Sequence, residues 1–473
     1  MYTRQLRNAI LLAGGYCTLK GYDMNFEDWK RKASKKPTQY THFDCRISLQ
    51  RCLKYITSPQ KVISHGFYPF IHYTVSTRKI KNGHKGEPKN RDIYYAAHID
   101  SWIYKYYAFM LNEKYNHRLL LDGIDDVPIA YRNNKGKSNI DFSKKAFNFI
   151  EQTKNCWVMI GDFTNFFDRL DHCYLKQQLC NLLESDSLPD DYYAVFKNIT
   201  NFSSVDLNKL LALNNLPDTA TGHREFNSFK RKRAISLQDF KRNKNLITRQ
   251  KDKKFGIPQG SPISAVLANI YMLSCDKQLY KFVTSKNGLY MRYSDDFIII
   301  IPYNNDNKHF GDFYEKIMNI LNRVTRLQLE QNKTKIFHYH NNSIENISHR
   351  IVNNSEKQKH LIEFLGFSFD GKNIRIRDKT ISKYYNKLYR KIKTIIYQYG
   401  NQNTPRKIHP KILYEKYTYR GSKAYSTKNK NDASKGNFID YVIRAQNKFG
   451  QKTVGIILRR HMQKIRKKLN SIK

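Results

Sequence analysis

The stretch Tyr293-Ser294-Asp295-Asp296 places two adjacent carboxylates between two apolar runs, 288–292 and 297–301. Each run is long enough for a strand and rich in residues that favour β-structure. A Ser-Asp-Asp link between two strands predicts a tight hairpin with both acids at its tip. Adjacent carboxylates repel each other, so a rigid turn that holds them favours a hard divalent cation such as Mg²⁺. For this pair alone, a polar turn that merely caps a hairpin is the alternative.

Two further segments complete a candidate site. The apolar run 156–161 ends in Asp162, which predicts a third acid at the C-terminal end of a strand. The chain continues from this acid as Phe163-Thr164-Asn165-Phe166-Phe167-Asp168. Downstream, the Gly- and Pro-rich stretch 254–264 predicts a loop that opens an apolar helix over 265–273. Its central residues are Pro258-Gln259-Gly260-Ser261-Pro262.

The order of these motifs resembles that of reverse transcriptases, in particular the bacterial and group II intron-like branch. An aspartate followed by Phe-Phe-Asp comes first, then Pro-Gln-Gly-Ser-Pro, then Tyr-x-Asp-Asp. Each motif alone is weak, whereas the three in this order are specific. The resemblance covers about residues 70–370. It implies an α+β right-hand polymerase with fingers, a palm of antiparallel sheet plus helices, and a helical basic thumb. The activity that it implies is RNA-directed DNA synthesis.

The resemblance also implies roles for individual residues. The catalytic residues would be Asp162, Asp295 and Asp296, and the Phe163 carbonyl would be a further metal ligand. Two Mg²⁺ ions are expected, and Mn²⁺ can substitute for them. Phe167 matches the steric gate, where a bulky ring excludes a ribose 2′-OH and so selects dNTPs. Core packing is the alternative role for Phe167, and Phe166 could serve it equally.

Substrate contacts follow from the same resemblance. The residues expected at the dNTP are Lys85 and Arg91 from a basic loop over 79–91, Phe167, Gln259, Gly260, and Lys333 as general acid for pyrophosphate. The primer would contact Tyr293, and Phe364 and Gly366 of a primer-grip hairpin in which Asp370-Gly371 predicts a type I′ turn. Segment 130–138 resembles a template-contacting segment whose Arg and Lys side chains suit phosphates. The alternatives are solvated loops, Lys81 or Lys89 in the role of Lys85, and a strand edge near Lys333.

The composition favours a nucleic acid as partner. The 473 residues carry 84 Lys and Arg against 40 Asp and Glu, which gives a net charge of +44. Such an excess suits a polyanion, and 34 Tyr and 27 Phe add aromatic faces for unpaired bases. Codon bias in an AT-rich genome would explain the Lys and Tyr but not the shortage of acids. Seven cysteines without a Cys-x-x-Cys pair predict reduced thiols in the cytoplasm, which the resemblance implies is bacterial, and no run approaches a membrane span.

The same signals suggest how the chain divides. We expect an N-terminal extension over 1–39, fingers over 40–150, and a palm over 151–370 that includes part of the fingers. A basic insertion near 200–254 contains Lys230-Arg231-Lys232-Arg233, for which a solvated loop is the default and RNA contact the alternative. Residues 371–473 are expected to form the thumb or C-terminal RNA-binding region, because apolar residues recur at helical spacing among many basic ones.

The kind of reverse transcriptase follows by elimination. Retron-type segments and a His-Asn-His nuclease cluster are absent from the sequence, and the intact Pro-Gln-Gly disfavours the diversity-generating type. The chain therefore resembles free-standing enzymes of phage defence and abortive infection, which copy a noncoding RNA or prime themselves. An intron maturase-like RNA-binding protein and protein-primed, template-independent DNA synthesis stay open. The expected partners are an RNA template, a DNA product and dNTPs. The sequence leaves open the template, the product, a partner protein and a homo-oligomer.

Overall fold

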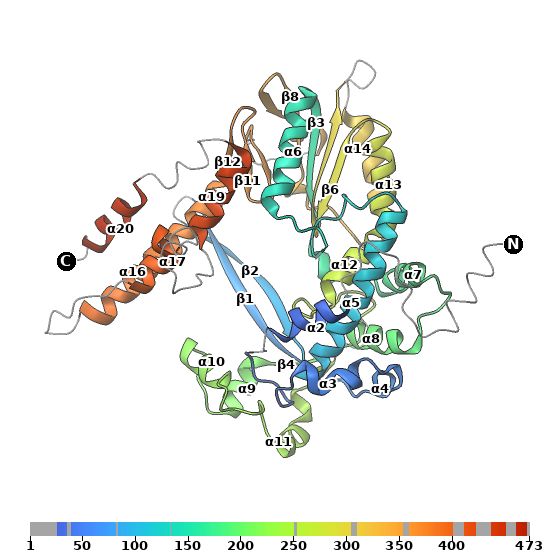
Figure 1. The fold of residues 1–473 in the computed structure, drawn as a ribbon, viewed down its shortest axis with the longest axis vertical. Coiled ribbons are helices and arrows are strands. Elements are labelled where there is room, and N and C mark those ends of the chain that lie inside the picture. The colour runs from blue at the N-terminus through green and yellow to red at the C-terminus, as the bar shows by residue number, and fades with distance from the viewer. Residues whose placement is uncertain are drawn as a thin grey trace.

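The computed structural model describes residues 26–35, 39–81, 84–132, 134–249, 253–303, 310–352, 359–400, 411–421, 437–450 and 460–470. Figure 1 shows a sheet flanked by helices in the upper part of the view, a long hairpin below it, and an arm of helices at one side. This mixed α+β arrangement confirms the expected right-hand polymerase fold. Within the described ranges, no helix is long and apolar enough to cross a membrane.

The palm is a five-stranded antiparallel sheet in the order β6-β7-β3-β8-β9. The central strands are nearly continuous apolar runs because helices or a second sheet cover both faces. One face packs against α13 and α14, the other against α6 and the small sheet β10-β11-β12 (Figure 1). The strands are β3 (Asn155–Asp162), β6 (Leu289–Tyr293), β7 (Asp296–Pro302), β8 (Lys335–His340) and β9 (Ser343–Asn346), and the helices are α6 (Asn139–Thr153), α13 (Leu273–Thr284) and α14 (Phe310–Leu321).

The register of the palm strands brings the acidic residues together. Asp162, the last residue of β3, lies opposite Asp296, the first residue of β7. Tyr293 pairs with Asp296, so Ser294 and Asp295 form a two-residue turn between β6 and β7. Ser294 has a φ of 60° and Asp295 has a negative φ, which is the pattern of a type II′ hairpin turn. The predicted hairpin and the predicted strand that ends at Asp162 are both confirmed.

The fingers contain a hairpin where we expected a loop. Strands β1 (Phe70–Lys81) and β2 (His84–Tyr95) pair over almost their whole length, so the predicted basic loop over 79–91 is wrong. The Gly and Pro signals misled the prediction, since Pro88 lies on an edge strand, where a missing N–H donor is tolerated. Strands β4 (Ser203–Asp206) and β5 (Thr248–Arg249) complete this sheet in the order β2-β1-β4-β5.

The basic insertion is folded, so its default reading as a solvated loop is wrong. Helices α9 (Leu207–Leu213), α10 (Ala220–Phe226) and α11 (Leu237–Arg242) enclose a small apolar core with residues of β1 and β4. Figure 1 shows these helices at the end of the molecule opposite the palm sheet. The sequence-based prediction failed because each helix is short, whereas the core that stabilises them is assembled from distant segments.

Other helices buttress the fingers and the palm. They are α2 (Phe26–Ser34), α3 (Leu49–Ile56), α4 (Pro59–Ile63), α5 (His98–Leu121), α7 (His172–Leu183), α8 (Asp190–Thr200), α12 (Ser264–Tyr271) and the one-turn α15 (Ser348–Ile351). The expected helix after the Pro-Gln-Gly loop is therefore confirmed as α12. The basic C-terminal part contains α16 (Asp378–Gly400), α17 (Lys411–Tyr417), α19 (Phe438–Phe449) and α20 (His461–Asn470), which confirms its helical character.

The small sheet carries a turn that we predicted at the wrong place. Strands β10 (Ile362–Phe364), β11 (Phe367–Phe369) and β12 (Ile374–Ile376) are antiparallel. A type I′ turn needs positive φ at both central residues, and Leu365 and Gly366 satisfy this with φ of 46° and 91°. Between β11 and β12 only Gly371 has a positive φ, so the predicted type I′ turn there is wrong. The Asp370 carboxylate instead accepts N–H bonds from the turn backbone.

Candidate active site

Three carboxylates gather where the ends of β3 and β7 meet the turn between β6 and β7. Backbone hydrogen bonds hold this meeting point from two directions. The Phe163 N–H donates to the carbonyl of Asp295 at 3.3 Å, and the Glu330 N–H donates to the carbonyl of Asp162 at 2.8 Å. The acids are therefore fixed by the sheet and by the loop before β8, rather than by one flexible segment.

The electrostatics of this corner favour the uptake of positive charge. Burial raises the pKa of Asp295, and the Asp162 charge raises it further. Burial together with the charges of Asp295 and Asp162 raises the pKa of Asp296 to about 7, although the Asp296 side chain still reaches solvent. Lys333 opposes both increases. Repulsion between carboxylates is relieved by a proton or by a cation, and a cation leaves them ionised.

Lys333 already supplies one positive charge at this corner. Its Nζ lies 2.5 Å from Oδ2 of Asp162, and both side chains are partly open to solvent. The residue belongs to a short 3₁₀ turn, Gln331–Lys333, in the same loop whose Glu330 N–H binds the Asp162 carbonyl. This loop therefore holds the ammonium group against Asp162 through the backbone as well as the side chain.

A divalent cation fits the chemistry of these acids. Over the described parts of the chain, no three or more His, Cys, Asp or Glu side chains form a ready-made cage for an ion. The three acids offer only carboxylate oxygens, the charge of Asp162 raises the pKa of both Asp295 and Asp296, and Asp162 already binds an ammonium group. Such a donor set suits a hard ion, which would take the place of the Lys333 ammonium at Asp162.

A buried ion pair beneath the turn escaped the sequence analysis. Arg292 is fully buried in β6 and forms a bidentate pair with Asp276 of α13, at 2.8 and 2.6 Å. A further Arg292 nitrogen donates to the carbonyl of Ser294 at 3.0 Å, and Tyr290 donates to Asp276 at 2.8 Å. The pair therefore orients the turn that carries Asp295. A charged Arg within an apolar strand was the available signal, because a buried charge needs a partner.

The predicted Pro-Gln-Gly loop contacts the fingers directly. The Gln259 carbonyl accepts the N–H of Tyr94 in β2 at 2.8 Å. Gly260 has a φ of 109°, and a Cβ there would lie 2.5 Å from the Tyr94 carbonyl oxygen, so only glycine fits. The loop and β2 therefore form one wall, which also carries Arg91, three residues before Tyr94.

Arg91 also faces the segment that follows Asp162. Burial and the charge of Asp92 raise the pKa of Asp168, and the charges of Lys253 and Arg91 oppose this rise. Arg91 is exposed, so a phosphate could reach it. Lys85 lies in β2, but its side chain falls outside the described residues. The dNTP roles of Arg91, Lys85, Gln259 and Gly260 stay predictions.

The two adjacent phenylalanines have different surroundings. The Phe166 ring is buried and stacks on the buried Phe163 ring, with centroids 5.7 Å apart. Phe167 is only half-buried, and its carbonyl accepts the N–H of Ile257 at 3.0 Å. Phe166 therefore lies in the core, whereas Phe167 packs against that core from a half-buried position, so its role as the gate stays a prediction. The Phe163 carbonyl as a metal ligand stays a prediction.

The predicted primer contacts lie on two elements. The Tyr293 ring is half-buried, 6.5 Å from the exposed ring of Tyr131. The Phe364 side chain is buried in the core beneath the small sheet, so only its backbone could meet a primer. Gly366 lies in the turn that Asn139 secures by donating to the Leu365 carbonyl at 2.9 Å. The primer roles of Tyr293, Phe364 and Gly366 stay predictions.

Two cations of the predicted template segment, which we expected to contact phosphates, bind protein groups instead. Arg132 is buried and forms an ion pair with Asp125, and Lys135 binds the same carboxylate. Arg132 also bonds Asn116 at 2.8 Å. These cations therefore stabilise the loop rather than stand ready for phosphates. Tyr131, with a left-handed φ of 60°, and Lys137 are exposed residues of the segment.

Comparison with known proteins identifies a family. The sequence model described as Reverse transcriptase (RNA-dependent DNA polymerase) matches residues 110–369, more than half of the chain. This range includes all three acids and the Pro-Gln-Gly loop. No curated protein matches the chain.

Solved structures give a weaker likeness. Apo telomerase from Candida tropicalis, truncated from its C-terminal domain, is 12% identical over 70% of this chain and 58% of its own, with a TM-score of 0.40. Telomerase from Candida albicans with a fragment of telomeric RNA is 12% identical over 94% of this chain and 59% of its own, also with a TM-score of 0.40. The chain thus spans less than two thirds of the length of these telomerases.

Proposed function

Because the chain belongs to the reverse transcriptase family and is an RNA-directed DNA polymerase, we propose that Asp162, Asp295 and Asp296 are its catalytic residues. The observation that carries this proposal is the register that sets Asp162 opposite Asp296 with Asp295 in the adjoining turn. The three acids would hold two Mg²⁺ ions, for which Mn²⁺ can substitute. When bound, such ions activate the attacking primer oxygen and stabilise the leaving pyrophosphate.

The remaining residues bind and orient the substrates in this proposal. Arg91 and Lys85 of β2 would neutralise the triphosphate, and the backbone around Gln259 and Gly260 would border the new base pair. Phe167 would close the space that a 2′-hydroxyl needs. Lys333 would turn from Asp162 to the leaving pyrophosphate and donate a proton there. Its present contact with Asp162 supports this role, because it places an ammonium group at the reacting end of the site.

The wider role rests on the sequence. We propose a free-standing bacterial enzyme of the cytoplasm that copies a dedicated noncoding RNA in defence against phage. The net charge of +44 supports a long RNA contact, and the motif order supports this branch of the family. RNA binding of the intron-maturase kind and DNA synthesis primed on a protein hydroxyl are the competing proposals.

The test is incorporation of labelled dNTPs by protein purified with its own RNA. The double variant Asp295→Asn/Asp296→Asn should lose at least about 10³-fold in rate, because charge stabilisation in the transition state is lost. A matched control is Asp312→Asn/Glu315→Gln, which removes two exposed carboxylates from α14 and should retain full activity. Full activity in the folded Asp295/Asp296 variant would sink the assignment. Sequencing the product would identify the copied RNA, and release of DNA by protease would indicate protein priming.

A further inference from the structure

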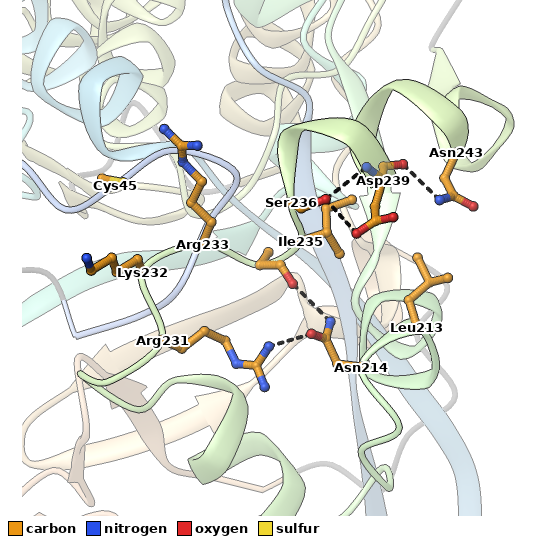
Figure 2. A pocket seen from close by; sticks show the side chains of 11 residues that line it. Cys45, Leu213, Asn214, Arg231, Lys232, Arg233, Ile235, Ser236, Asp239 and Asn243 are labelled. Carbon is orange, nitrogen blue, oxygen red and sulfur yellow. Dashed lines mark hydrogen bonds between the residues drawn. The ribbon is translucent and has the colours of Figure 1, made fainter.

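A cavity of about 540 Å³ lies in the basic insertion, away from the three acids. Figure 2 shows its walls, which come from α9, α11, the segment between α10 and α11, and the loop before α3. Its size falls within the range of small-ligand sites and can admit one nucleotide. The lining residues are Cys45, Leu213, Asn214, Arg231, Lys232, Arg233, Ala234, Ile235, Ser236, Asp239 and Asn243.

Two cations of this cavity have no anionic partner in the structure. Among the described residues, neither Lys232 nor Arg233 forms a hydrogen bond or an ion pair, and in Figure 2 no dashed line joins either side chain to the other lining residues. The Nε of Arg233 is buried and still lacks a hydrogen-bond acceptor. A buried guanidinium donor without an acceptor is costly unless a ligand supplies one. The single lining acid, Asp239, already accepts the Ser236 hydroxyl at 2.6 Å.

Hydrogen bonds within the protein hold the other polar side chains that line the cavity. Arg231 donates to Asn214, which in turn donates to the carbonyls of Leu210 and Ala234 at 2.7 and 2.9 Å. On the other wall, Asn243 donates to the Asp239 carbonyl at 2.8 Å. The asparagines and Arg231 that frame the cavity therefore bond to protein, whereas no such bond is found for Lys232 and Arg233 among the described residues.

An aromatic ring stands beside the basic run. Phe229 is 69% exposed, and the Arg46 guanidinium lies 5.1 Å from its ring centroid. Lys230 follows directly, so an exposed aromatic face leads into four consecutive cations. Residues 207–249 carry ten Lys and Arg against three Asp and Glu. Aromatic faces for bases next to cations for phosphates are the combination that binds single-stranded nucleic acid.

We propose that this cavity is a second RNA site, in which Lys232 and Arg233 bind the phosphate of a single-stranded nucleotide while Phe229 stacks on a neighbouring base. The choice of RNA rests on the proposed function, which requires an RNA template. Arginine suits phosphate because its planar fork donates two parallel hydrogen bonds. The site anchors RNA at the fingers, apart from the catalytic acids. A free mononucleotide shares the phosphate chemistry, so the test includes it.

The first arm of the test uses a reporter that the chain already contains. Cys45 lines the cavity and is exposed, whereas Cys173, also exposed, lies on α7 outside it. The full-length protein is labelled with N-ethylmaleimide, with and without saturating oligouridine, in EDTA so that no synthesis occurs. We expect RNA to slow Cys45 labelling about tenfold relative to Cys173, and AMP at the same nucleotide concentration to leave it unchanged. Equal Cys45 labelling with and without RNA overturns the proposal, as does protection by AMP.

The second arm compares two double variants of equal charge. Lys232→Ala/Arg233→Ala removes the cavity cations, and Lys241→Ala/Arg242→Ala removes two cations of α11 that do not line the cavity. The cavity variant should lose Cys45 protection, and the salt dependence of its oligouridine affinity should fall by about 0.7 in log–log slope, the value for one phosphate contact on a single strand. The control should keep Cys45 protection and most of its slope. Protection that survives in the cavity variant, or equal loss in both, overturns the site.

These outcomes are separate from the test of catalysis. Binding in EDTA needs neither the acids nor dNTPs, so a chain without polymerase activity can still show the RNA site. Conversely, extension of a short annealed primer should be equal in the wild type and in the Lys232→Ala/Arg233→Ala variant. Failure of the RNA site therefore leaves the proposed catalytic assignment intact.

Discussion

Two groups of charged side chains lie on either side of one turn, and they are balanced in opposite ways. Beneath the turn, Arg292 and Asp276 neutralise each other in complete burial. Above it, the three carboxylates of Asp295, Asp296 and Asp162 carry more negative charge than the nearby Lys333 ammonium can neutralise. The link is short, because Arg292 binds the carbonyl of Ser294, directly before Asp295. The satisfied pair makes the turn rigid, and the rigid turn keeps the unsatisfied acids together.

This difference distinguishes charges that stabilise the fold from charges that are available to bind a ligand. A buried pair with complete hydrogen bonding has nothing left to offer a ligand, whereas acids that raise one another's pKa gain most from a cation. Mutations in the two groups should therefore change the stability of the fold in opposite directions. Loss of one partner of the buried pair beneath the turn should destabilise the fold. Loss of one acid above the turn should stabilise the fold and remove activity.

The largest effect on stability is expected from Asp276→Ala. This change leaves the Arg292 guanidinium buried without its counter-charge and also removes the acceptor of Tyr290. We expect the free energy of unfolding to fall by about 3–5 kcal/mol, measured by urea denaturation. Glu345→Ala, which breaks the exposed pair with Arg350, is the control and should cost less than about 1 kcal/mol. Similar losses in the two variants would contradict the structural role of the buried pair.

The next effect concerns Lys333 above the turn. Lys333→Met should lower the rate of dNTP incorporation by about 10²-fold or more, because it removes the proposed proton donor to pyrophosphate. The unfolding free energy should change by less than about 1 kcal/mol, since the contact with Asp162 is partly exposed. Lys316→Met, at an exposed position of α14, is the control and should leave the rate unchanged. An unaltered rate in Lys333→Met would remove this residue from the reaction.

A smaller effect is expected from divalent cation on the unmutated chain. Mg²⁺ at ten times its dissociation constant should stabilise the native state by about 1.4 kcal/mol, because it binds the folded acids and not the unfolded chain. The measurement is the melting temperature in Mg²⁺ against EDTA. The shift should vanish in Asp295→Asn/Asp296→Asn and persist in Asp312→Asn/Glu315→Gln. An equal shift in both double variants would place the bound ion elsewhere.

The smallest effect is a gain of stability from Asp296→Asn without metal. The folded pKa of Asp296 is raised to about 7, above the ordinary value of about 4, so the native state binds more protons between these values. Wild-type stability should therefore fall as pH rises from about 4 to about 7, whereas this contribution is absent from the variant. Above pH 7 in EDTA, the variant should be more stable by about 0.2–1 kcal/mol, a discounted figure because the side chain reaches solvent. Urea titrations at pH 4.5 and 7.5 measure the difference, and equal stabilities at pH 7.5 would show that the acids do not repel.

Local signals predicted the parts of the site that depend on neighbouring residues. The strand before Asp162, the hairpin with Asp295 at its tip and the helix after the Pro-Gln-Gly loop were all predicted from short stretches. The same signals failed over 79–91, where Gly and Pro suggested a loop, and at Asp370-Gly371, where the turn type was wrong. In both cases pairing with the neighbouring strand of a hairpin determined the backbone, and the propensities of Gly, Pro and Asp did not.

The sequence by itself determined the family, the three acids and the basic character of the chain, because these are matters of residue type and order. The tertiary structure decided which residues meet. It set Asp162 opposite Asp296, paired Arg292 with Asp276, and buried Phe166 in the core while leaving Phe167 half-buried against it. It also folded the insertion around a shared core and left Lys232 and Arg233 without a partner among the residues that the structure describes. Burial and ion pairing depend on contacts between residues on different elements of the chain. A local sequence pattern therefore does not show which distant side chain will neutralise a given charge.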